Sequence, residues 1–133
     1  MIELKNVNFR YNMEEASGGL HEINLVISNG EVVLLCGQSG CGKTTLTRLI
    51  NGLIPNYYNG RLSGDVMIDS RNLSKLSLYE ISKFVGSVFQ NPRTQFFNVD
   101  STSELAFACE NQGLPENKIV SSIFETATMF NIN

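Results

Sequence analysis

Residues 32–45 of this 133-residue chain read VVLLCGQSGCGKTT and decide its fold. The first five residues are apolar at every position, which is typical of a β-strand covered on both faces in an α/β sheet. Gly37, four further residues and then Gly42-Lys43-Thr44 have the spacing of a phosphate-binding loop. The apolar residues that follow share one stripe of a predicted helix: Leu46, Leu49, Ile50 and Leu53. The motif thus lies between a buried strand and an amphipathic helix, as phosphate binding requires.

The residue types in this loop suit a nucleotide triphosphate that carries Mg2+. Small residues let successive backbone N–H groups turn toward a phosphate, and the helix amino terminus adds the positive end of its dipole. The loop residues that we expect to bind the nucleotide are Gly37, Ser39, Gly40, Cys41 and Gly42. Lys43 can reach the outer phosphate oxygens, and the Thr44 hydroxyl is placed to ligate Mg2+. Thr45 adds a hydroxyl for an inner phosphate.

Hydrophobic periodicity predicts the elements on either side of the loop. Alternating apolar residues predict strands at 7–11 and 23–27, separated by a loop at 12–19, and Asn29-Gly30 predicts a tight hairpin turn before the buried strand. Gly52 and Pro55 end the helix. Residues 66–68 and 84–89 are then predicted strands, with a short helix at 78–83 between them.

The carboxyl-terminal third is predicted to be helical. Ser101 and Glu104 have the spacing of a capping box, which predicts that a helix begins there. A final helix is predicted from Pro115, with four apolar residues on one face: Ile119, Ile123, Ala127 and Phe130.

Composition argues against several classes of protein. Ten Lys and Arg against 13 Asp and Glu give a formal charge of -3 with no block of like charges, which disfavours a nucleic-acid partner. The longest apolar run, residues 32–36, is far shorter than the roughly 20 residues of a membrane helix, so we expect no direct membrane insertion. The three cysteines have no metal-ligand spacing, which favours a reducing cytosol.

A phosphate loop alone leaves several nucleotide-binding classes open. A guanine-specific GTPase would offer Asn-Lys-x-Asp, but the sequence Asn117-Lys118-Ile119-Val120 lacks the acid. A small kinase would need an arginine-bearing lid, and Arg93 is the only arginine after Arg71. A non-catalytic module that senses ATP stays an alternative.

Two further stretches carry a resemblance to a known family. The predicted strand that ends in Phe9-Arg10-Tyr11 precedes the phosphate loop, and Val88-Phe89-Gln90-Asn91-Pro92 follows it. With these stretches the chain resembles the ATP-binding subunit of an ABC transporter. The resemblance implies that the nucleotide is ATP, that Tyr11 stacks on adenine, and that Gln90 helps to place Mg2+ and the attacking water, as a catalytic and metal-site residue.

The resemblance is narrower over part of the chain. Residues 90–97, 51–55 and 104–107 are similar to the ATPases of energy-coupling factor importers, the cobalt and vitamin transporters. This similarity implies uptake of a vitamin or metal ion driven by ATP. It also implies a transmembrane coupling protein and a second ATPase subunit as partners, with the subunit in the cytoplasm and peripheral on the inner face of the membrane.

The resemblance also implies the fold class, an α/β P-loop NTPase of the ABC ATPase type. Residues 1–98 correspond to the amino-terminal part of the ATP-binding core, with an antiparallel β portion, the start of a parallel core sheet, the phosphate loop and the glutamine loop. Residues 99–133 correspond to the start of a helical subdomain. The family's signature loop, Asp-Glu strand end and switch histidine are not found in these residues, so we expect an incomplete domain, a fragment of a longer protein.

We predict that this chain binds ATP with Mg2+ but hydrolyses it negligibly, although the intact subunit would be an ATPase. The attacking water needs a carboxylate to orient it, and the residues that would supply one are missing. Phosphate release by the purified chain should equal the background without protein. Turnover comparable to that of a complete transport ATPase would contradict this prediction.

Overall fold

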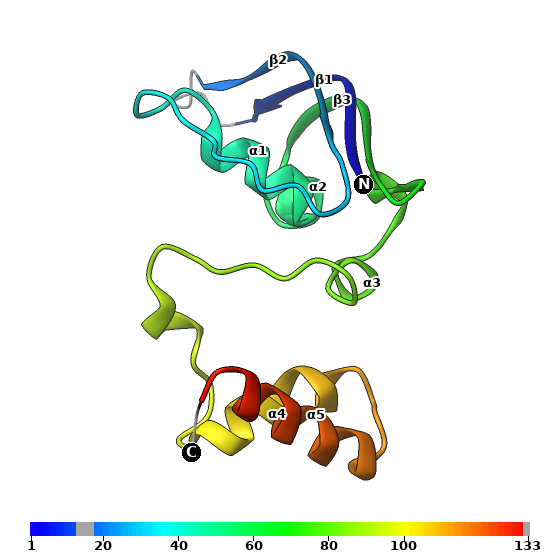
Figure 1. Cartoon of the computed structure of the whole chain (residues 1–133). Coiled ribbons are helices and arrows are strands. Elements are labelled where there is room, and N and C mark those ends of the chain that lie inside the picture. The colour runs from blue at the N-terminus through cyan, green and yellow to red at the C-terminus, as the bar shows by residue number, and fades with distance from the viewer. Residues whose placement is uncertain (13–17, 132–133) are drawn as a thin grey trace. The chain divides into compact units, whose positions relative to one another are not determined.

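A computed structural model describes residues 1–12 and 18–131 (Figure 1). The loop predicted at residues 12–19 therefore lies mostly outside the described residues. The chain forms two compact units, Met1–Ser87 and Val88–Asn133, and each is described by itself. The boundary expected at residue 98 concerns the subdomains of the family and stays a prediction.

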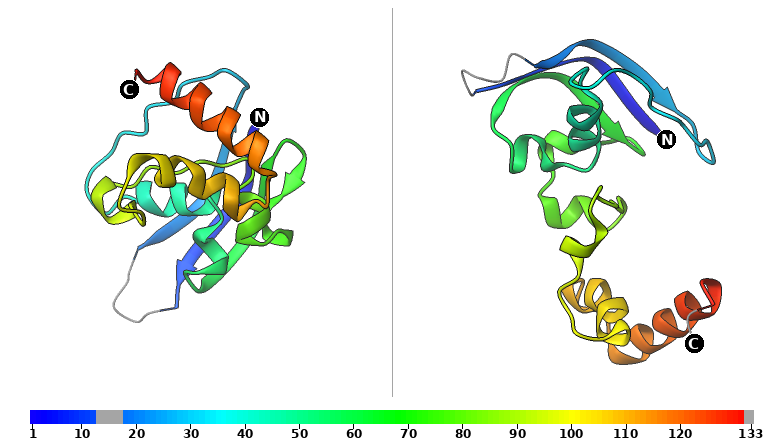
Figure 2. Two further views of the ribbon diagram at one scale, coloured as in Figure 1. Left: turned by 90° about the horizontal axis from the view of Figure 1, so that it is seen from below. Right: turned by 90° about the vertical axis from the view of Figure 1, so that its left-hand side faces the viewer.

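The first unit is an antiparallel sheet with helices on one face. The strands are β1 (Ile2–Tyr11), β2 (Gly19–Ile27), β3 (Gly60–Ile68) and β4 (Arg71–Asn72), in the order β2-β1-β3-β4. The helices are α1 (Lys43–Ile50), α2 (Leu53–Asn56), α3 (Leu78–Ile81) and the 3-10 turn η1 (Leu73–Lys75). Figure 2 shows α1 and α2 beneath the curved sheet. The strands predicted at 7–11, 23–27 and 66–68 are confirmed.

The core of this unit lies between the sheet and α1. Leu46 and Leu49 of the predicted stripe are buried, whereas Ile50 is half-buried and Leu53 is half-buried at the start of α2. Strand β1 contributes Leu4, Val7 and Phe9. The remaining core residues come from the following elements: Ile54, Val66, Ile68, Leu73 and Ile81. Burying an aliphatic or aromatic side chain contributes about 2 kcal/mol, so the α1 interface holds the helix firmly against the strands.

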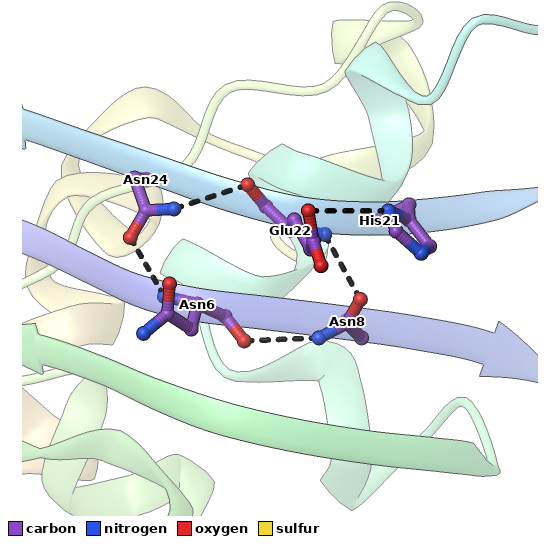
Figure 3. A network of polar contacts seen from close by, with 5 residues as sticks. All are labelled: Asn6, Asn8, His21, Glu22 and Asn24. Atoms are coloured by element: carbon purple, nitrogen blue, oxygen red, sulfur yellow. Dashed lines mark hydrogen bonds and ion pairs between the residues drawn. The ribbon is translucent and has the colours of Figure 1, made fainter.

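Bulges shift the register between β1 and β2 on either side of Val7, and Figure 3 shows the polar side chains of this region. Asn6 and Glu22 have left-handed φ values of 48° and 47°. Asn8 accepts a hydrogen bond from the Glu22 amide at 2.9 Å and donates to the Asn6 carbonyl at 3.0 Å. Asn24 makes the equivalent pair, with the Asn6 amide at 2.9 Å and the Glu22 carbonyl at 3.1 Å. The two asparagine amides thus replace ladder hydrogen bonds that the bulges interrupt.

His21 and Glu22 stand at the edge of this network, with His21 Nδ1 4.0 Å from a Glu22 carboxylate oxygen. Both side chains are exposed, so the contact is a surface one.

The two strands predicted for a parallel core do not form. Residues 32–36 lie outside the sheet, and Val32 and Leu34 are 97% and 85% exposed. In residues 84–89, Phe84 and Val85 pack against the core, but Val88 is 90% exposed and the segment is no strand. A fully buried strand needs a neighbour on each edge and a layer on each face. The described residues supply neither for these two segments.

The turn predicted before residue 32 forms without a hairpin. The Glu31 amide donates to the Ser28 carbonyl at 3.3 Å, and Gly30 has a φ of 76°. Because residues 32–36 do not pair with β2, the turn redirects the chain but joins no second strand.

The second unit begins with an irregular segment containing the 3-10 turn η2 (Pro92–Gln95) and ends in two helices, α4 (Ser101–Asn111) and α5 (Glu116–Met129). The helices predicted from Ser101 and Pro115 are confirmed. Ile119, Ile123 and Ala127 are half-buried on one face of α5, whereas Phe130 follows the helix and is exposed. No helix of the described residues is both long and apolar enough to cross a bilayer.

The capping box predicted at the start of α4 is wrong. Asp100 caps this helix and accepts hydrogen bonds from the Ser103 amide and hydroxyl, both at 2.8 Å. These hydrogen bonds lower the pKa of Asp100 below its usual value. Glu104 turns instead to the preceding loop and accepts from the amides of Phe97 at 3.1 Å and Asn98 at 2.9 Å. Because Asp100 is one residue earlier and its carboxylate reaches the Ser103 amide, Ser101 is displaced from the capping position.

The close approach of the backbone at Gly64 to the bulge in β1 leads us to predict that Gly64→Ala lowers the free energy of unfolding. Gly64 has a φ of 84°, and a Cβ there would lie 2.4 Å from the Asn6 carbonyl oxygen. Gly30 has a φ of 76° with nothing within 4 Å of its Cβ position, so Gly30→Ala is the matched control. Gly30→Ala should lower the free energy of unfolding by about 1 kcal/mol, which is the cost of the left-handed conformation. Gly64→Ala should cost about 2 kcal/mol more, since backbone atoms must move apart. Urea denaturation measures both, and equal losses would contradict the assigned contact.

Candidate phosphate-binding site

The phosphate loop leads directly into α1. Gly40 and Gly42 have φ values of 81° and 96°, a conformation that favours glycine. A Cβ at Gly42 would also lie 2.7 Å from Leu20 Cδ2, so the loop packs closely on β2 at this point. The Leu46 amide donates to the Gly42 carbonyl at 2.9 Å, which closes the first turn of α1. The backbone amides at the start of this helix are the donors that would form hydrogen bonds to a bound anion.

The Lys43 side chain folds back across the loop. Its Nζ donates to the Gly37 carbonyl at 2.7 Å and to the Gln38 carbonyl at 2.6 Å. The ammonium group therefore lies within the curve of the loop, where the sequence motif predicts that it meets phosphate oxygens. A phosphate would offer charged acceptors in place of the two carbonyls, and hydrogen bonds between charged groups are the stronger kind.

Two hydroxyls at the start of α1 face different surroundings. Thr44 is exposed, so its hydroxyl is open to a ligand from solvent. Thr45 is only 8% exposed, and its Oγ1 lies 3.2 Å from the Tyr11 hydroxyl. Successive helical residues point about 100° apart, which explains the difference.

The contact between Tyr11 and Thr45 joins two predicted parts of the site. Tyr11 ends β1, and Thr45 lies in the first turn of α1, 34 positions further along the chain. The residue predicted to meet the base and a residue predicted to meet an inner phosphate are thus neighbours.

The structure places the other predicted loop residues at the surface. Ser39, Gly40 and Cys41 are exposed, and the Cys41 amide donates to the Gln38 carbonyl at 3.3 Å. The Cys41 sulfur lies 3.6 Å from Lys43 Nζ, and a Cβ at Gly37 would lie 2.6 Å from that sulfur. Gly37 therefore leaves the space that the Cys41 side chain occupies.

Gln90 belongs to the second unit and is exposed. Nearby, the Phe89 amide donates to the Gln95 side-chain oxygen at 3.1 Å. The role of Gln90 in binding Mg2+ and in catalysis is still a prediction from the resemblance.

Sequence reasoning missed two residues beside Tyr11. Arg48 donates to the Tyr11 hydroxyl at 3.0 Å, and its guanidinium lies over the Tyr58 ring, 3.9 Å from the centroid. Helical spacing could have indicated Arg48, because it lies three residues after Thr45 and thus on the same side of α1. Tyr58 follows the short helix α2, and no pattern in the sequence places it near the loop.

Comparisons with known proteins identify a family over most of the chain. The family described as "ABC transporter" matches residues 20–131. A putative ABC transporter ATP-binding protein of Treponema denticola is 51% identical over 123 residues, which are 92% of this chain and 25% of the relative. A putative ABC transporter ATP-binding protein of Pyrococcus abyssi is 41% identical over 90% of this chain and 42% of its own length.

A third relative bears on the narrower resemblance. The energy-coupling factor transporter ATP-binding protein EcfA1 of Streptococcus thermophilus is 36% identical over 94% of this chain and 44% of its own length. The chain thus spans less than half the length of these three relatives. The match over residues 20–131, together with the phosphate loop that leads into α1, shows that the chain belongs to the ABC transporter ATP-binding family.

Proposed function

We propose that this chain binds ATP and Mg2+ as part of the ATPase subunit of an energy-coupling factor type importer for a vitamin or metal ion. The observation that carries the proposal is the hydrogen bond between Tyr11 and Thr45, which brings the predicted base and phosphate contacts together. The family match supports the nucleotide class.

Binding of the triphosphate would use groups that the loop already presents. The amides at the start of α1 would donate to phosphate oxygens, and Lys43 would exchange its two carbonyl partners for charged oxygens. The Thr45 hydroxyl would meet an inner phosphate while it stays in contact with Tyr11. The Tyr11 ring would then form a stacking surface for adenine.

The site offers a hard oxygen ligand for Mg2+. Thr44 is exposed in the first turn of α1, and a hydroxyl oxygen beside phosphate oxygens suits a cation that prefers oxygen ligands. Gln90 would add an amide oxygen in the intact protein and help to orient the attacking water. The Mg2+ ion would neutralise charge on the phosphates during hydrolysis.

The type of importer rests on two supports. Residues 90–97 resemble the importer ATPases, and one relative at 36% identity is named an energy-coupling factor transporter ATP-binding protein. In this proposal the intact subunit pairs with a second ATPase subunit and a transmembrane coupling protein. It would work in the cytoplasm, on the inner face of the membrane.

The first test is saturable ATP binding by the 133-residue chain, measured by isothermal titration calorimetry. Lys43→Ala should weaken binding by about tenfold or more, because it removes a charged partner of the phosphates. Lys75→Ala is the matched control, since Lys75 is an exposed lysine in η1. Absence of saturable binding, or equal affinity of the wild type and Lys43→Ala, would contradict the proposal.

A second test concerns Mg2+. The wild type should bind ATP more tightly with Mg2+ than with a chelator, and Thr44→Ala should lose most of that difference. Thr47→Ala is the control, because Thr47 is also exposed on α1 and its hydroxyl donates to the Thr44 carbonyl at 2.9 Å. An unchanged Mg2+ effect in Thr44→Ala would remove Thr44 from the metal site.

A further inference from the structure

Arg48 joins the aromatic residues of the first unit to the helix that follows the phosphate loop. It is half-buried on α1 and contacts both Tyr11, through Nη1 at 3.0 Å, and the Tyr58 ring, at 3.9 Å. A guanidinium has only donors, so the Tyr11 oxygen is the acceptor in this hydrogen bond. The proton of the Tyr11 hydroxyl is therefore available for Thr45 Oγ1, 3.2 Å away.

The contacts around Tyr11 fix the plane of its ring. The ring meets Phe9 edge to face, with centroids 4.8 Å apart and planes at 83°. It meets Tyr58 in the same way at 6.4 Å and 90°. Edge-to-face pairs are favourable, but they leave a ring free to slide along its own plane. The hydrogen bonds from Arg48 and to Thr45 hold the hydroxyl end and stop that movement.

Arg48 is itself held in place. Stacking over Tyr58 restrains the long side chain before any ligand arrives, so the conformational entropy of the guanidinium is already reduced. Since α1 also carries Lys43, Thr44 and Thr45, the same rigid element would set both the phosphate contacts and the orientation of Tyr11.

We infer that Arg48 is a positioning residue for the nucleobase. It holds the hydroxyl end of the Tyr11 ring, whose plane is set by Phe9 and Tyr58, in the position in which a purine stacks, and it increases the affinity for the whole nucleotide without touching the phosphates. The inference rests on the proposed function, in which Tyr11 meets adenine, and goes beyond it by assigning a role to Arg48.

The test compares two ligands on the 133-residue chain, ATP and inorganic tripolyphosphate, each with Mg2+ in a calorimetric titration. Arg48→Met keeps the apolar stem but loses the donor. It should weaken ATP binding about tenfold and change tripolyphosphate binding by less than about twofold. Arg48→Lys should recover part of the loss, because it restores one charged donor. A residue with a purely structural role would change the affinity for both ligands alike.

Arg71→Met is the matched control. The Arg71 guanidinium also lies over an aromatic ring, that of Phe84 at 5.2 Å, but Arg71 is on β4 and makes no contact with Tyr11 among the described contacts. Its affinities for both ligands should equal those of the wild type.

Tyr11→Phe supplies a second, independent arm. This change removes the Tyr11 hydroxyl, and with it both the hydrogen bond from Arg48 and the one to Thr45, so it should weaken ATP binding severalfold and leave tripolyphosphate binding nearly unchanged. In the Tyr11→Phe background, Arg48→Met should cost less than about twofold in ATP affinity, since the Arg48–Tyr11 hydrogen bond is already absent there. If Arg48→Met does not fold by circular dichroism, Tyr11→Phe decides the question, and unchanged ATP affinity overturns the inference.

The outcomes separate the two proposals. A wild type that binds neither ligand contradicts the proposed function. A wild type that binds ATP while Arg48→Met binds it equally well overturns the role of Arg48 alone. Equal weakening for ATP and tripolyphosphate, or equal cost in the wild type and in Tyr11→Phe, also overturns it.

Discussion

The packing of α1 against the antiparallel sheet is the constraint on which the site depends. Leu46 and Leu49 are buried in one apolar core with residues of β1, and this core holds α1 in place. The beginning of α1 in turn fixes the free amides and the directions of Lys43, Thr44 and Thr45. The chemistry of the loop is local, but its position comes from apolar contacts on the opposite side of the helix.

Local sequence patterns were sufficient to predict a helix or strand where its packing partners lie in the same 133 residues. Alternation predicted β1 and β2, and helical spacing predicted α1, because each of these patterns reports burial in the same core. The phosphate loop was recognised from its own residue types, which need no partner elsewhere in the chain. Residues 32–36 show the opposite case. Their apolar character was recognised, but a buried strand is a property of its neighbours, which no periodicity within the segment supplies.

The sequence did not predict the residue that caps α4 or the contacts of Arg48, for two different reasons. Asp100 and Ser101 can both cap a helix by composition, and the choice depends on the path of the preceding loop, where Glu104 is engaged. Arg48 belongs to none of the motifs in the sequence. Its contacts with Tyr11 and Tyr58 form only when β1 and the segment after α2 are folded onto the same side of α1. Tertiary contacts of this kind join residues that share no sequence pattern.

The two ends of the phosphate loop differ in their packing, because segment 32–36 before the loop is exposed. Its downstream end enters a packed helix, while its upstream end continues into backbone outside the sheet, whose amides are open to exchange with solvent. The loop is therefore held by packing at its downstream end, whereas its upstream end lacks a strand partner among the described residues. A strand or partner that pairs with residues 32–36 would make the phosphate loop more rigid without changing any group that is proposed to contact the nucleotide.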